Sequence, residues 1–386
     1  MFEEYSRVYA KIDLGAIKYN LDSMKNNIPA GTRMMAVIKT DAYGHGAVRI
    51  GQMLESVDYI WGYATATAEE AFELRDNGIK KPILVLGYTF PYAYERMLKE
   101  GIRPAVFRTD MAKELSDCAK HIMEEDSSVQ ELPIHIAVDT GMSRIGITPD
   151  ENGMDFVKKV MDLEGIKVEG IFTHFARADE EDLTNAKERE KVFADFVKNL
   201  EEEMGVRIPL HHCANSASII AVPESSMDMV RAGVTMYGMW PSDEVSRDII
   251  DLKPTMELIS HVVMIKVVPA GTPVSYGGTF VTDKPTKIAT IPVGYGDGYP
   301  RSLSNKGYVF INGKPANILG RVCMDQFMVD VTDIDDVKEG DEVVLLGKDK
   351  VSGEEITAEF LGDLGGRFNY ELTCNINKRV PRVYVR

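Results

Sequence analysis

The sequence predicts an α/β protein with a (β/α)8 (TIM) barrel as its N-terminal domain and a mostly β C-terminal domain. Up to about residue 240, eight short apolar runs alternate with amphipathic stretches of helical spacing, as parallel strands and their crossover helices do. After Pro241, the apolar runs have period-two patterning and many β-branched residues, which is typical of an all-β domain.

The eight apolar runs are the predicted barrel strands. They are MMAVIK (34–39), YIWGYA (59–64), PILVLG (82–87), RPAVF (103–107), LPIHIAVD (132–139), IKVEGIFTH (166–174), IPLHHCA (208–214) and MDMVR (227–231). A barrel needs this number of strands, and an open doubly wound sheet is the competing arrangement. Residues 47–57 and 186–204 are predicted helices because their apolar side chains recur on one stripe.

The predicted β domain contains several extended runs separated by turns. The runs cover residues 258–268, 286–295, 308–319, 326–332 and 341–347. The pairs Asn312-Gly313 and Glu339-Gly340 predict turns. Because residues 242–251 are polar, we expect domains at 1–243 and 244–386, with residues 1–12 pairing with the β domain.

Composition excludes several classes of function. Among 386 residues, 44 are Lys or Arg and 60 are Asp or Glu, which gives a net charge of −16 and argues against nucleic acid or an anionic membrane as partner. The chain shows neither a transmembrane run nor the pattern of a signal peptide. Its four cysteines are too widely spaced for a zinc pattern and too few for a disulfide scaffold. We expect a cytoplasmic protein without a metal site.

Polar residues at the C-terminal ends of the predicted strands mark the candidate active site, because barrels place their sites there. Lys39 closes the first strand, where desolvation favours a neutral, nucleophilic amine; a lysine there can also simply reach water. Arg144 follows the fifth strand and suits either a carboxylate clamp or a surface salt bridge. His174 follows the sixth and suits either a ligand contact or a hydrogen bond within the core.

The loops after the seventh and eighth strands predict a phosphate site, as barrels commonly build one there. Ser216 offers a hydroxyl beside Asn215, and Gly233 lets the backbone approach a ligand closely. A phosphate site opposite a lysine on the first strand points to pyridoxal 5′-phosphate held as a Schiff base.

Two further patterns are excluded. The stretch from Gly294 to Gly298 looks like a nucleotide loop, but no amphipathic helix follows it and it lies in the β domain. His211 and His212 are adjacent on a strand, so their side chains point to opposite faces and do not share a metal site without help.

Ordered blocks along nearly the whole chain resemble the alanine racemase family of fold-type III pyridoxal-phosphate enzymes. The blocks are AVIKTDAYGHG (36–46), DTGMSRIG (139–146), THFARADE (173–180), NSAS (215–218), VRAGVTMYG (230–238), SYGGTF (275–280), GYGDGYPR (294–301), GRVCMDQFMVD (320–330) and RVPR (379–382). The resemblance implies a racemase that interconverts L- and D-alanine and supplies D-alanine for peptidoglycan.

The resemblance also implies roles for matching residues. Lys39 and Tyr276 would be the two bases, since racemisation removes the Cα proton from one face and returns a proton to the other. In this family the tyrosine comes from the second subunit, which implies a head-to-tail homodimer with shared sites. The cofactor would be bound by Lys39, Tyr43, His174, Asn215, Ser216, Arg231, Gly233 and Val234. The substrate would be bound by Arg144, Met324, Tyr295 and Asp325.

Arg231 would face the pyridine nitrogen of the cofactor and keep it unprotonated, because a guanidinium has donors but no acceptor. His174 would bridge Arg231 and Tyr276. Cys323 would lie near the site through its place in the CMD block, so thiol reagents are expected to inhibit.

Two positions depart from the family pattern. Ala137 stands where many members have a carbamylated lysine that orients the clamping arginine, and Lys378 stands where many have a tyrosine that contacts the phosphate. A serine or alanine/serine racemase is therefore an alternative. A pyridoxal-phosphate-dependent basic-amino-acid decarboxylase, which shares the architecture, is a remoter one, because the Tyr276 and RVCMDQ blocks favour racemisation.

Overall fold

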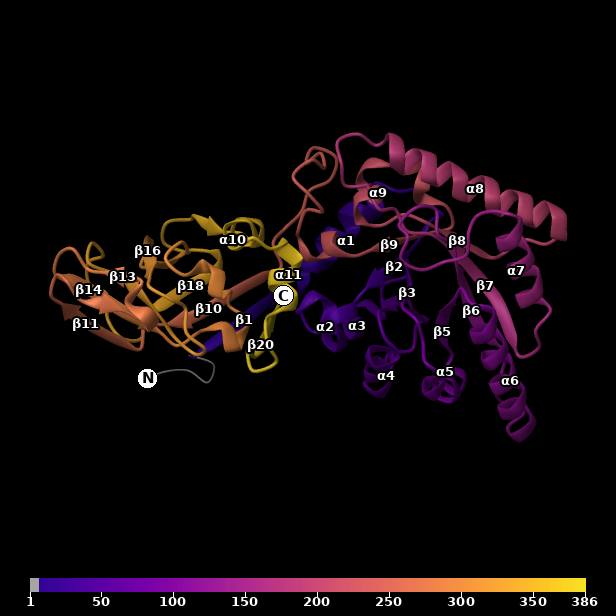
Figure 1. The fold of residues 1–386 in the computed structure, drawn as a ribbon, viewed down its shortest axis with the longest axis horizontal. Helices are drawn as coiled ribbons and strands as arrows, with labels where there is room; N and C mark the ends of the chain where they lie inside the picture. Colours follow the sequence, from indigo (N-terminus) through magenta and orange to yellow (C-terminus); the bar gives the residue numbers. More distant parts are fainter. Residues whose placement is uncertain (1–6) are drawn as a thin grey trace.

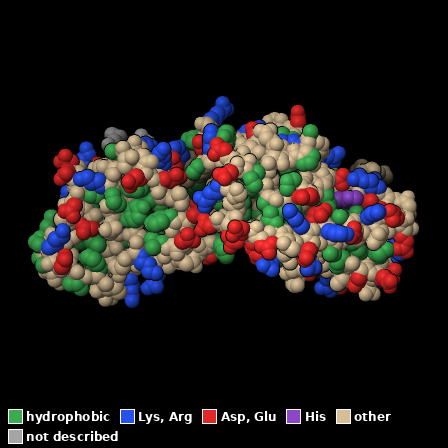
Figure 2. Space-filling model, turned by 90° about the horizontal axis from the view of Figure 1, so that it is seen from above, with side chains coloured by type: hydrophobic (Ala, Val, Ile, Leu, Met, Phe, Trp, Pro, Cys, Tyr) green, Lys and Arg blue, Asp and Glu red, His purple; other side chains and the backbone are tan. Residues whose placement is uncertain are grey.

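The computed structural model describes residues 7–386 and contains two lobes that lie side by side (Figure 1). One lobe is a barrel surrounded by helices, and the other is built mainly of strands. On the face shown in Figure 2, acidic and basic side chains are interspersed over both lobes. Among the described residues, no helix has both the length and the apolar character that a membrane span requires.

The barrel consists of eight parallel strands. They are β2 (Arg33–Val37), β3 (Ile60–Thr65), β4 (Ile83–Val85), β5 (Ile102–Val106), β6 (Leu132–Ala137), β7 (Ile166–Phe172), β8 (Leu210–His212) and β9 (Met229–Ala232). They pair in the order β8-β7-β6-β5-β4-β3-β2-β9. The backbone N–H of Arg231 donates to the carbonyl of Ala214 at 3.0 Å, which nearly closes the ring between β8 and β9. Each predicted run overlaps one of these strands, so the barrel is confirmed and the open doubly wound sheet is wrong.

Helices connect the strands and cover the outside of the barrel (Figure 1). They are α1 (Leu14–Asn26), α2 (Lys39–Tyr43), α3 (Ala47–Leu54), α4 (Ala68–Asp76), α5 (Tyr94–Glu100), α6 (Thr109–Glu125), α7 (Glu151–Met161), α8 (Thr184–Met204) and α9 (Ser216–Ala221). Capping side chains fix the residue at which several helices begin. Thr67 and Glu70 form a capping box on α4, and Asp150 caps α7. The helices predicted at 47–57 and 186–204 are α3 and α8.

The second lobe is mostly β, as predicted. Its strands are β1 (Val8–Asp13), β10 (Met256–His261), β11 (Met264–Val268), β12 (Pro273–Val274), β13 (Phe280–Val281), β14 (Thr286–Ile291), β15 (Tyr308–Ile311), β16 (Lys314–Leu319), β17 (Phe327–Asp330), β18 (Glu342–Lys348), β19 (Glu355–Ile356) and β20 (Arg382–Val385). The main sheet has the order β11-β14-β17-β16-β15-β18-β10-β1-β20. Two helices, α10 (Ala358–Gly365) and α11 (Asn369–Cys374), complete the lobe.

Two details of this sheet follow from its pairing. Asn312 and Gly313 both have positive φ and form the predicted turn between β15 and β16. The run at 258–268 contains two strands, because β10 pairs with β18 and β1 whereas β11 pairs with β14 at the sheet edge.

The N-terminal strand β1 lies in the C-terminal sheet, antiparallel to β10 and parallel to β20. Residues 1–6, which were also expected to pair with this lobe, lie outside the described residues. The domain boundary between residues 243 and 244 stays a prediction.

Candidate active site

A cavity of about 590 Å³ lies where the barrel strands end at their C-terminal side. Its walls come from the loops that follow β2, β6, β7, β8 and β9, with further residues from the loops after β3 and β4. Nine of the predicted site residues line it: Lys39, Tyr43, Arg144, His174, Asn215, Ser216, Arg231, Gly233 and Val234. Side chains from distant parts of the sequence therefore meet in one space.

Lys39 lies in a turn with an uncommon backbone. Strand β2 ends two residues before it, and residues 40–43 all have positive φ between 51° and 54°. This left-handed conformation costs roughly 1–2 kcal/mol per non-glycine residue. The carboxylate of Glu70 helps to hold the turn by accepting a hydrogen bond from the backbone N–H of Thr40 at 2.6 Å. The turn directs both Lys39 and Tyr43 into the cavity.

The surroundings of Lys39 favour its neutral form. Burial lowers the pKa of Lys39, and the positive charge of Arg144 lowers it further, whereas Glu70 acts in the opposite direction. A lowered pKa increases the fraction of free amine, which a lysine needs to act as nucleophile or base.

Arg231 is a buried cation that no carboxylate contacts among the described residues. Its side chain is held by five contacts: Nη1 donates to Nδ1 and the carbonyl of His212 at 2.9 and 3.0 Å, and Nη2 lies 2.8 Å from the Thr173 carbonyl, 3.0 Å from the Cys213 carbonyl and 3.1 Å from Nδ1 of His174. Burial lowers the pKa of Arg231 to about 10, so it stays charged at neutral pH. The Nε–H has no partner among the described residues and remains available to a ligand.

His174 is neutral and has a defined tautomer. Burial, followed by the charges of Arg231 and Arg144, lowers the pKa of His174 well below its ordinary value. Because an arginine only donates, Nδ1 of His174 accepts the hydrogen bond from Arg231. The ring proton therefore sits on Nε2, which is free to donate to a further group.

Gly233 borders a small space between two hydroxyl groups. The hydroxyl of Ser216 accepts a hydrogen bond from the Gly233 backbone N–H at 2.9 Å. A Cβ atom at position 233 would lie 3.3 Å from the Tyr43 hydroxyl and 3.5 Å from the Ser216 hydroxyl. Beside them, the Asn215 side chain caps α9 by accepting from the Ser218 N–H. The hydroxyl donors and the open space fit a phosphate group.

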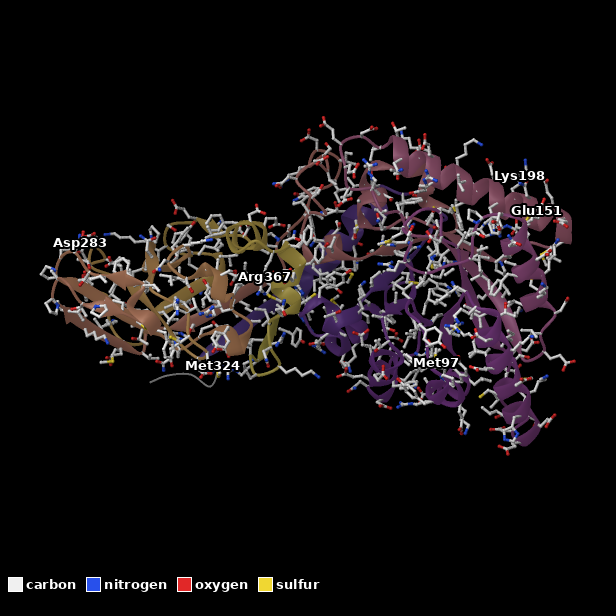
Figure 3. The ribbon with its side chains drawn as sticks, in the orientation of Figure 1. Met97, Glu151, Lys198, Asp283, Met324 and Arg367 are labelled. Carbon is white, nitrogen blue, oxygen red and sulfur yellow. The ribbon has the colours of Figure 1, made fainter. Side chains whose placement is uncertain are left out.

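The structure places the other four predicted site residues outside this cavity. Tyr276, Tyr295 and Met324 lie in the C-terminal lobe with 70%, 44% and 53% of their surface exposed, and Figure 3 shows Met324 there. Asp325 is also exposed and accepts a hydrogen bond from Arg379 at 2.5 Å. Within one chain, these residues do not meet the barrel cavity.

Cys323 lies beside the loop that carries Tyr276. Its sulfur is 3.4 Å from the hydroxyl of Ser275, the residue before the tyrosine. The thiol is half-buried. Whether Cys323 borders an active site depends on a second subunit, so its inhibition by thiol reagents stays a prediction.

The two departures from the family pattern have different surroundings. Ala137 is buried and lines the cavity, so no side chain at this position can orient Arg144. The described residues give Arg144 no hydrogen bond or ion pair. Lys378 is exposed and is not part of the cavity wall.

Tyr370 and Asp179 are among the wall residues that sequence reasoning did not assign to the site. Tyr370 is in α11 of the C-terminal lobe, and its ring meets that of Tyr43 edge-on at 6.4 Å. No local pattern marks Tyr370, because its position results from how the two lobes pack. Asp179 lies within the THFARADE block, so that block was its only signal.

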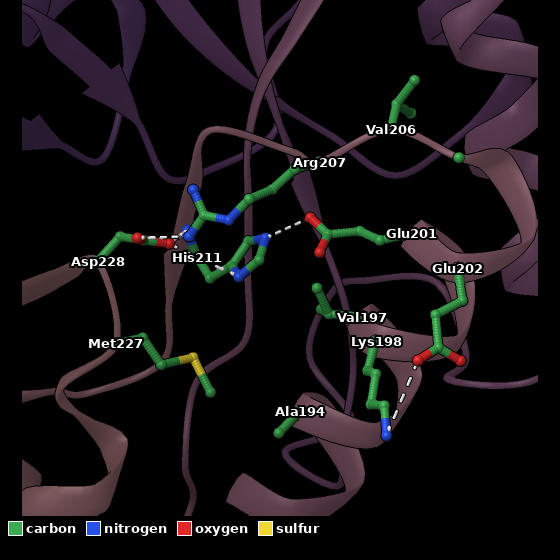
Figure 4. Close-up of a pocket in the computed structure, with 11 residues that line it drawn as sticks. Ala194, Val197, Lys198, Glu201, Glu202, Val206, Arg207, His211, Met227 and Asp228 are labelled. Carbon is green, nitrogen blue, oxygen red and sulfur yellow. Dashed lines mark hydrogen bonds and ion pairs between the residues drawn. The ribbon is translucent and has the colours of Figure 1, made fainter.

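The two adjacent histidines point in opposite directions, as predicted. His211 faces a hollow outside the barrel, where it contacts Glu201 at 2.8 Å and lies 3.6 Å from Asp228 (Figure 4). His212 is fully buried and faces Arg231.

Comparison with known proteins gives a consistent result. Residues 12–241 match the family described as "Alanine racemase, N-terminal domain", and residues 255–384 match "Alanine racemase, C-terminal domain". A protein named alanine racemase from Clostridium tetani is 46% identical, with 100% of this chain and 97% of that protein covered. One from Methanococcus maripaludis is 42% identical, with 98% of each covered.

Solved structures agree. The alanine racemase of Clostridium difficile superposes with a TM-score of 0.91 at 38% identity, covering 98% of this chain and 96% of that one. The Bacillus anthracis alanine racemase with bound L-Ala-P gives a TM-score of 0.89 at 33% identity, covering 100% and 96%. The chain is therefore an enzyme of the alanine racemase family.

Proposed function

We propose that the protein is a pyridoxal 5′-phosphate-dependent alanine racemase that uses Lys39 and Tyr276 of the partner subunit as its two bases. The observation that carries the proposal is the convergence of Lys39, Arg231 and the Gly233 space in one cavity. The full-length relatives named alanine racemase support alanine as the substrate.

The residues present fit the cofactor. Tyr43, Ser216 and the backbone of Gly233 and Val234 would hold its phosphate, and the amine of Lys39 would bind its aldehyde carbon. The free Nε–H of Arg231 would donate to the pyridine nitrogen. When bound, the cofactor supplies an electron sink that makes the Cα proton of the amino acid acidic.

The chain's own groups then act on the substrate. Arg144 has no competing partner among the described residues, so its guanidinium is free to bind the substrate carboxylate. The amine of Lys39, once the substrate amine displaces it from the cofactor, would take the Cα proton from one face, and the phenol oxygen of the partner's Tyr276 would exchange a proton at the other face. The Nε2–H of His174 would donate to that phenol oxygen and relay the charge of Arg231.

The proposal includes a head-to-tail homodimer, because Tyr276 and Met324 are exposed and lie outside the cavity of their own chain. It also includes a cytoplasmic location and the supply of D-alanine for peptidoglycan.

A serine or alanine/serine racemase is the second candidate. It is favoured by Ala137, which leaves Arg144 without the orienting side chain seen in many members, and by the exposed Lys378. Either substrate leaves the two-base chemistry unchanged.

A chiral assay of the purified protein on L-alanine, L-serine, L-lysine and L-arginine tests the proposal. We expect alanine to racemise fastest, without release of carbon dioxide. Lys39→Ala should lose both the activity and the visible absorption of the lysine-bound cofactor. If serine racemises faster than alanine, serine is the preferred substrate. Release of carbon dioxide from lysine or arginine would favour the decarboxylase instead.

A further inference from the structure

A continuous chain of polar side chains crosses the barrel interior behind Arg231. Nδ1 of His212 accepts from Arg231 at 2.9 Å, and Nε2 of His212 lies 2.9 Å from Nδ1 of His135. Nε2 of His135 lies 3.3 Å from Oε2 of Glu169. Arg103 then donates to both oxygens of Glu169, at 2.9 and 3.1 Å. Neither Glu169 nor His135 lines the cavity.

The hydrogen bonds that link Arg231 to Glu169 can all be satisfied in only one direction of proton donation. Arginine cannot accept a hydrogen bond, so Nδ1 of His212 carries the lone pair and Nε2 carries the proton. That proton is donated to Nδ1 of His135, whose own proton must then be on Nε2 and is donated to Glu169. The carboxylate of Glu169 only accepts, so it requires the same tautomers of both histidines that Arg231 requires from the other end.

The charge states agree with this direction. Burial lowers the pKa of His135, and it lowers the pKa of His212 well below the ordinary value. Both rings are therefore neutral at neutral pH. Burial raises the pKa of Glu169, but hydrogen bonds from His135 and Arg103 outweigh it and lower the pKa to about 2. The chain thus connects an ionised carboxylate to a buried cation through two neutral rings.

The backbone of β7 leaves room for the imidazole of His135, the middle residue of this hydrogen-bonded series. A Cβ atom at Gly170 would lie 2.5 Å from Nδ1 of His135, so a side chain at this position would displace the ring. Gly170 is the residue that pairs with His135 across β6 and β7. A glycine directly after Glu169 therefore lets the imidazole lie flat against the neighbouring strand.

We infer that Glu169 is a positioning residue for the reaction: through His135 and His212 it locks the guanidinium of Arg231 in the orientation that faces the cofactor. The inference rests on the proposed function, since it assigns a purpose to the orientation of Arg231. Without the carboxylate, His135 is free to carry its proton on Nδ1. His212 would then turn to the other tautomer and present a donor to Arg231, which breaks the contact.

Two variants break the chain at different links. Glu169→Leu removes the acceptor at its end, and His135→Phe removes the middle ring while leaving Glu169 and Arg103 paired. Glu169→Gln keeps an oxygen acceptor and serves as the conservative variant. Glu201→Leu is the matched control, because Glu201 contacts His211 at 2.8 Å outside the barrel, in the hollow of Figure 4, and has no link to Arg231.

The main readout is nitrogen NMR of the ¹⁵N-histidine-labelled holoenzyme, which distinguishes protonated from unprotonated ring nitrogens. We expect His135, His174 and His212 each to show a proton on Nε2 in the wild type and in Glu201→Leu. In Glu169→Leu and His135→Phe, we expect the His212 signal to shift toward the other tautomer. In Glu169→Gln it should stay close to the wild type.

Racemisation is the second readout. We expect kcat to fall about tenfold in Glu169→Leu and His135→Phe, the usual scale for losing the outer partner of a site imidazole, with KM for alanine nearly unchanged. Unchanged histidine signals together with an unchanged kcat would overturn the inference. Failure of the wild type itself to racemise any amino acid would instead overturn the proposed function, while the tautomer pattern would still test the chain.

Discussion

A glycine, an arginine and a lysine show how single residues shape this site. Gly233 keeps open the space between the hydroxyls of Tyr43 and Ser216. Arg231 is buried as a cation because backbone carbonyls and two imidazoles accept its N–H groups. Lys39 has a lowered pKa because it is buried beside Arg144. Each property belongs to a single residue, but each results from contacts with residues that are distant in the sequence.

Gly233→Val should weaken cofactor binding. A side chain there would fill the space in which the phosphate is proposed to lie, so we expect the Kd for pyridoxal phosphate to rise at least about tenfold, or about 1.4 kcal/mol. Titration followed by the visible absorption of the bound cofactor measures this. Gly31→Val is the control, since nothing lies within 4 Å of a Cβ there. Equal Kd values for both variants would contradict the phosphate assignment.

Thiol reagents should inhibit through Cys323. Burial raises the pKa of Cys374 to about 11 and that of Cys213 to about 12, so these thiols react slowly. The half-buried Cys323 lies beside the loop that carries Tyr276. We expect iodoacetamide to inactivate the wild type with time and Cys323→Ser to resist. Equal inactivation rates would show that another thiol is responsible.

At the scale of elements, the left-handed turn after β2 is the most unusual feature of the barrel. Four consecutive non-glycine residues have positive φ, and such strain persists only when the surroundings hold it. Glu70 contributes twice, because one oxygen accepts from the backbone N–H of Thr40 in the turn and the other accepts from the backbone N–H groups of Ala66 and Thr67, just before α4. Lys39 is thus positioned by a neighbouring helix.

Glu70→Ala should destabilise the protein. The backbone N–H groups of Thr40, Ala66 and Thr67 would lose their acceptor and α4 would lose one half of its capping box, so we expect the free energy of unfolding to fall by about 1–3 kcal/mol. Urea unfolding measures this, with the exposed Glu73→Ala of the same helix as control. A loss no larger than that of the control would show that the turn does not depend on Glu70.

A second element-scale feature is the buried carboxylate of Asp297, which organises the loop that carries Tyr295. It accepts hydrogen bonds from Arg7 at 2.8 Å, Arg379 at 2.7 Å and the backbone N–H of Gly294 at 3.0 Å. Burial raises the pKa of Asp297, but the two arginines outweigh it and hold the pKa below its ordinary value.

This carboxylate should make the stability depend on acid pH. Because the folded pKa is below the unfolded value of about 3.9, the contribution of Asp297 is complete above that pH and is lost as the pH falls through the folded pKa. We expect Asp297→Asn to be less stable than the wild type at neutral pH and the gap to shrink as the pH falls below the unfolded pKa of about 3.9. Urea unfolding at several pH values measures the gap. A gap that is constant with pH would rule out this coupling.

At the scale of the whole molecule, the two halves of the proposed chemistry lie on different lobes. Lys39 is in the barrel cavity, whereas Tyr276 is on the exposed surface of the C-terminal lobe. The proposed site therefore needs one barrel and the C-terminal lobe of a second subunit.

Mixing two inactive variants should restore activity. A heterodimer of Lys39→Ala and Tyr276→Phe contains one site with both changes and one with neither, so random exchange would restore about a quarter of the sites. We expect this recovery after the mixture is partly dissociated and reassembled, as measured by the racemisation rate. Each variant treated alone is the control, and no recovery despite proven heterodimers would place both bases in one subunit.

Much of this architecture could be predicted because it follows from local sequence patterns. The eight apolar runs and the Asn312-Gly313 turn give the barrel strands and a hairpin, since strand and turn formation depend on neighbouring residues. Six residues at strand ends could be assigned to one cavity, because parallel strands in a barrel bring their C-terminal ends together, and the family resemblance added Tyr43, Arg231 and Val234.

The remaining features needed the tertiary structure. By itself the sequence determined the two lobes, their strands and the convergence of Lys39, Arg144 and Arg231. Only the tertiary structure decided that Tyr370 joins the cavity from α11, that residues 40–43 form a left-handed turn, and that Glu169 reaches Arg231 through two histidines. The physical reason is that strand periodicity is a property of adjacent residues, whereas burial, hydrogen-bond direction and lobe packing depend on groups that are distant in the chain.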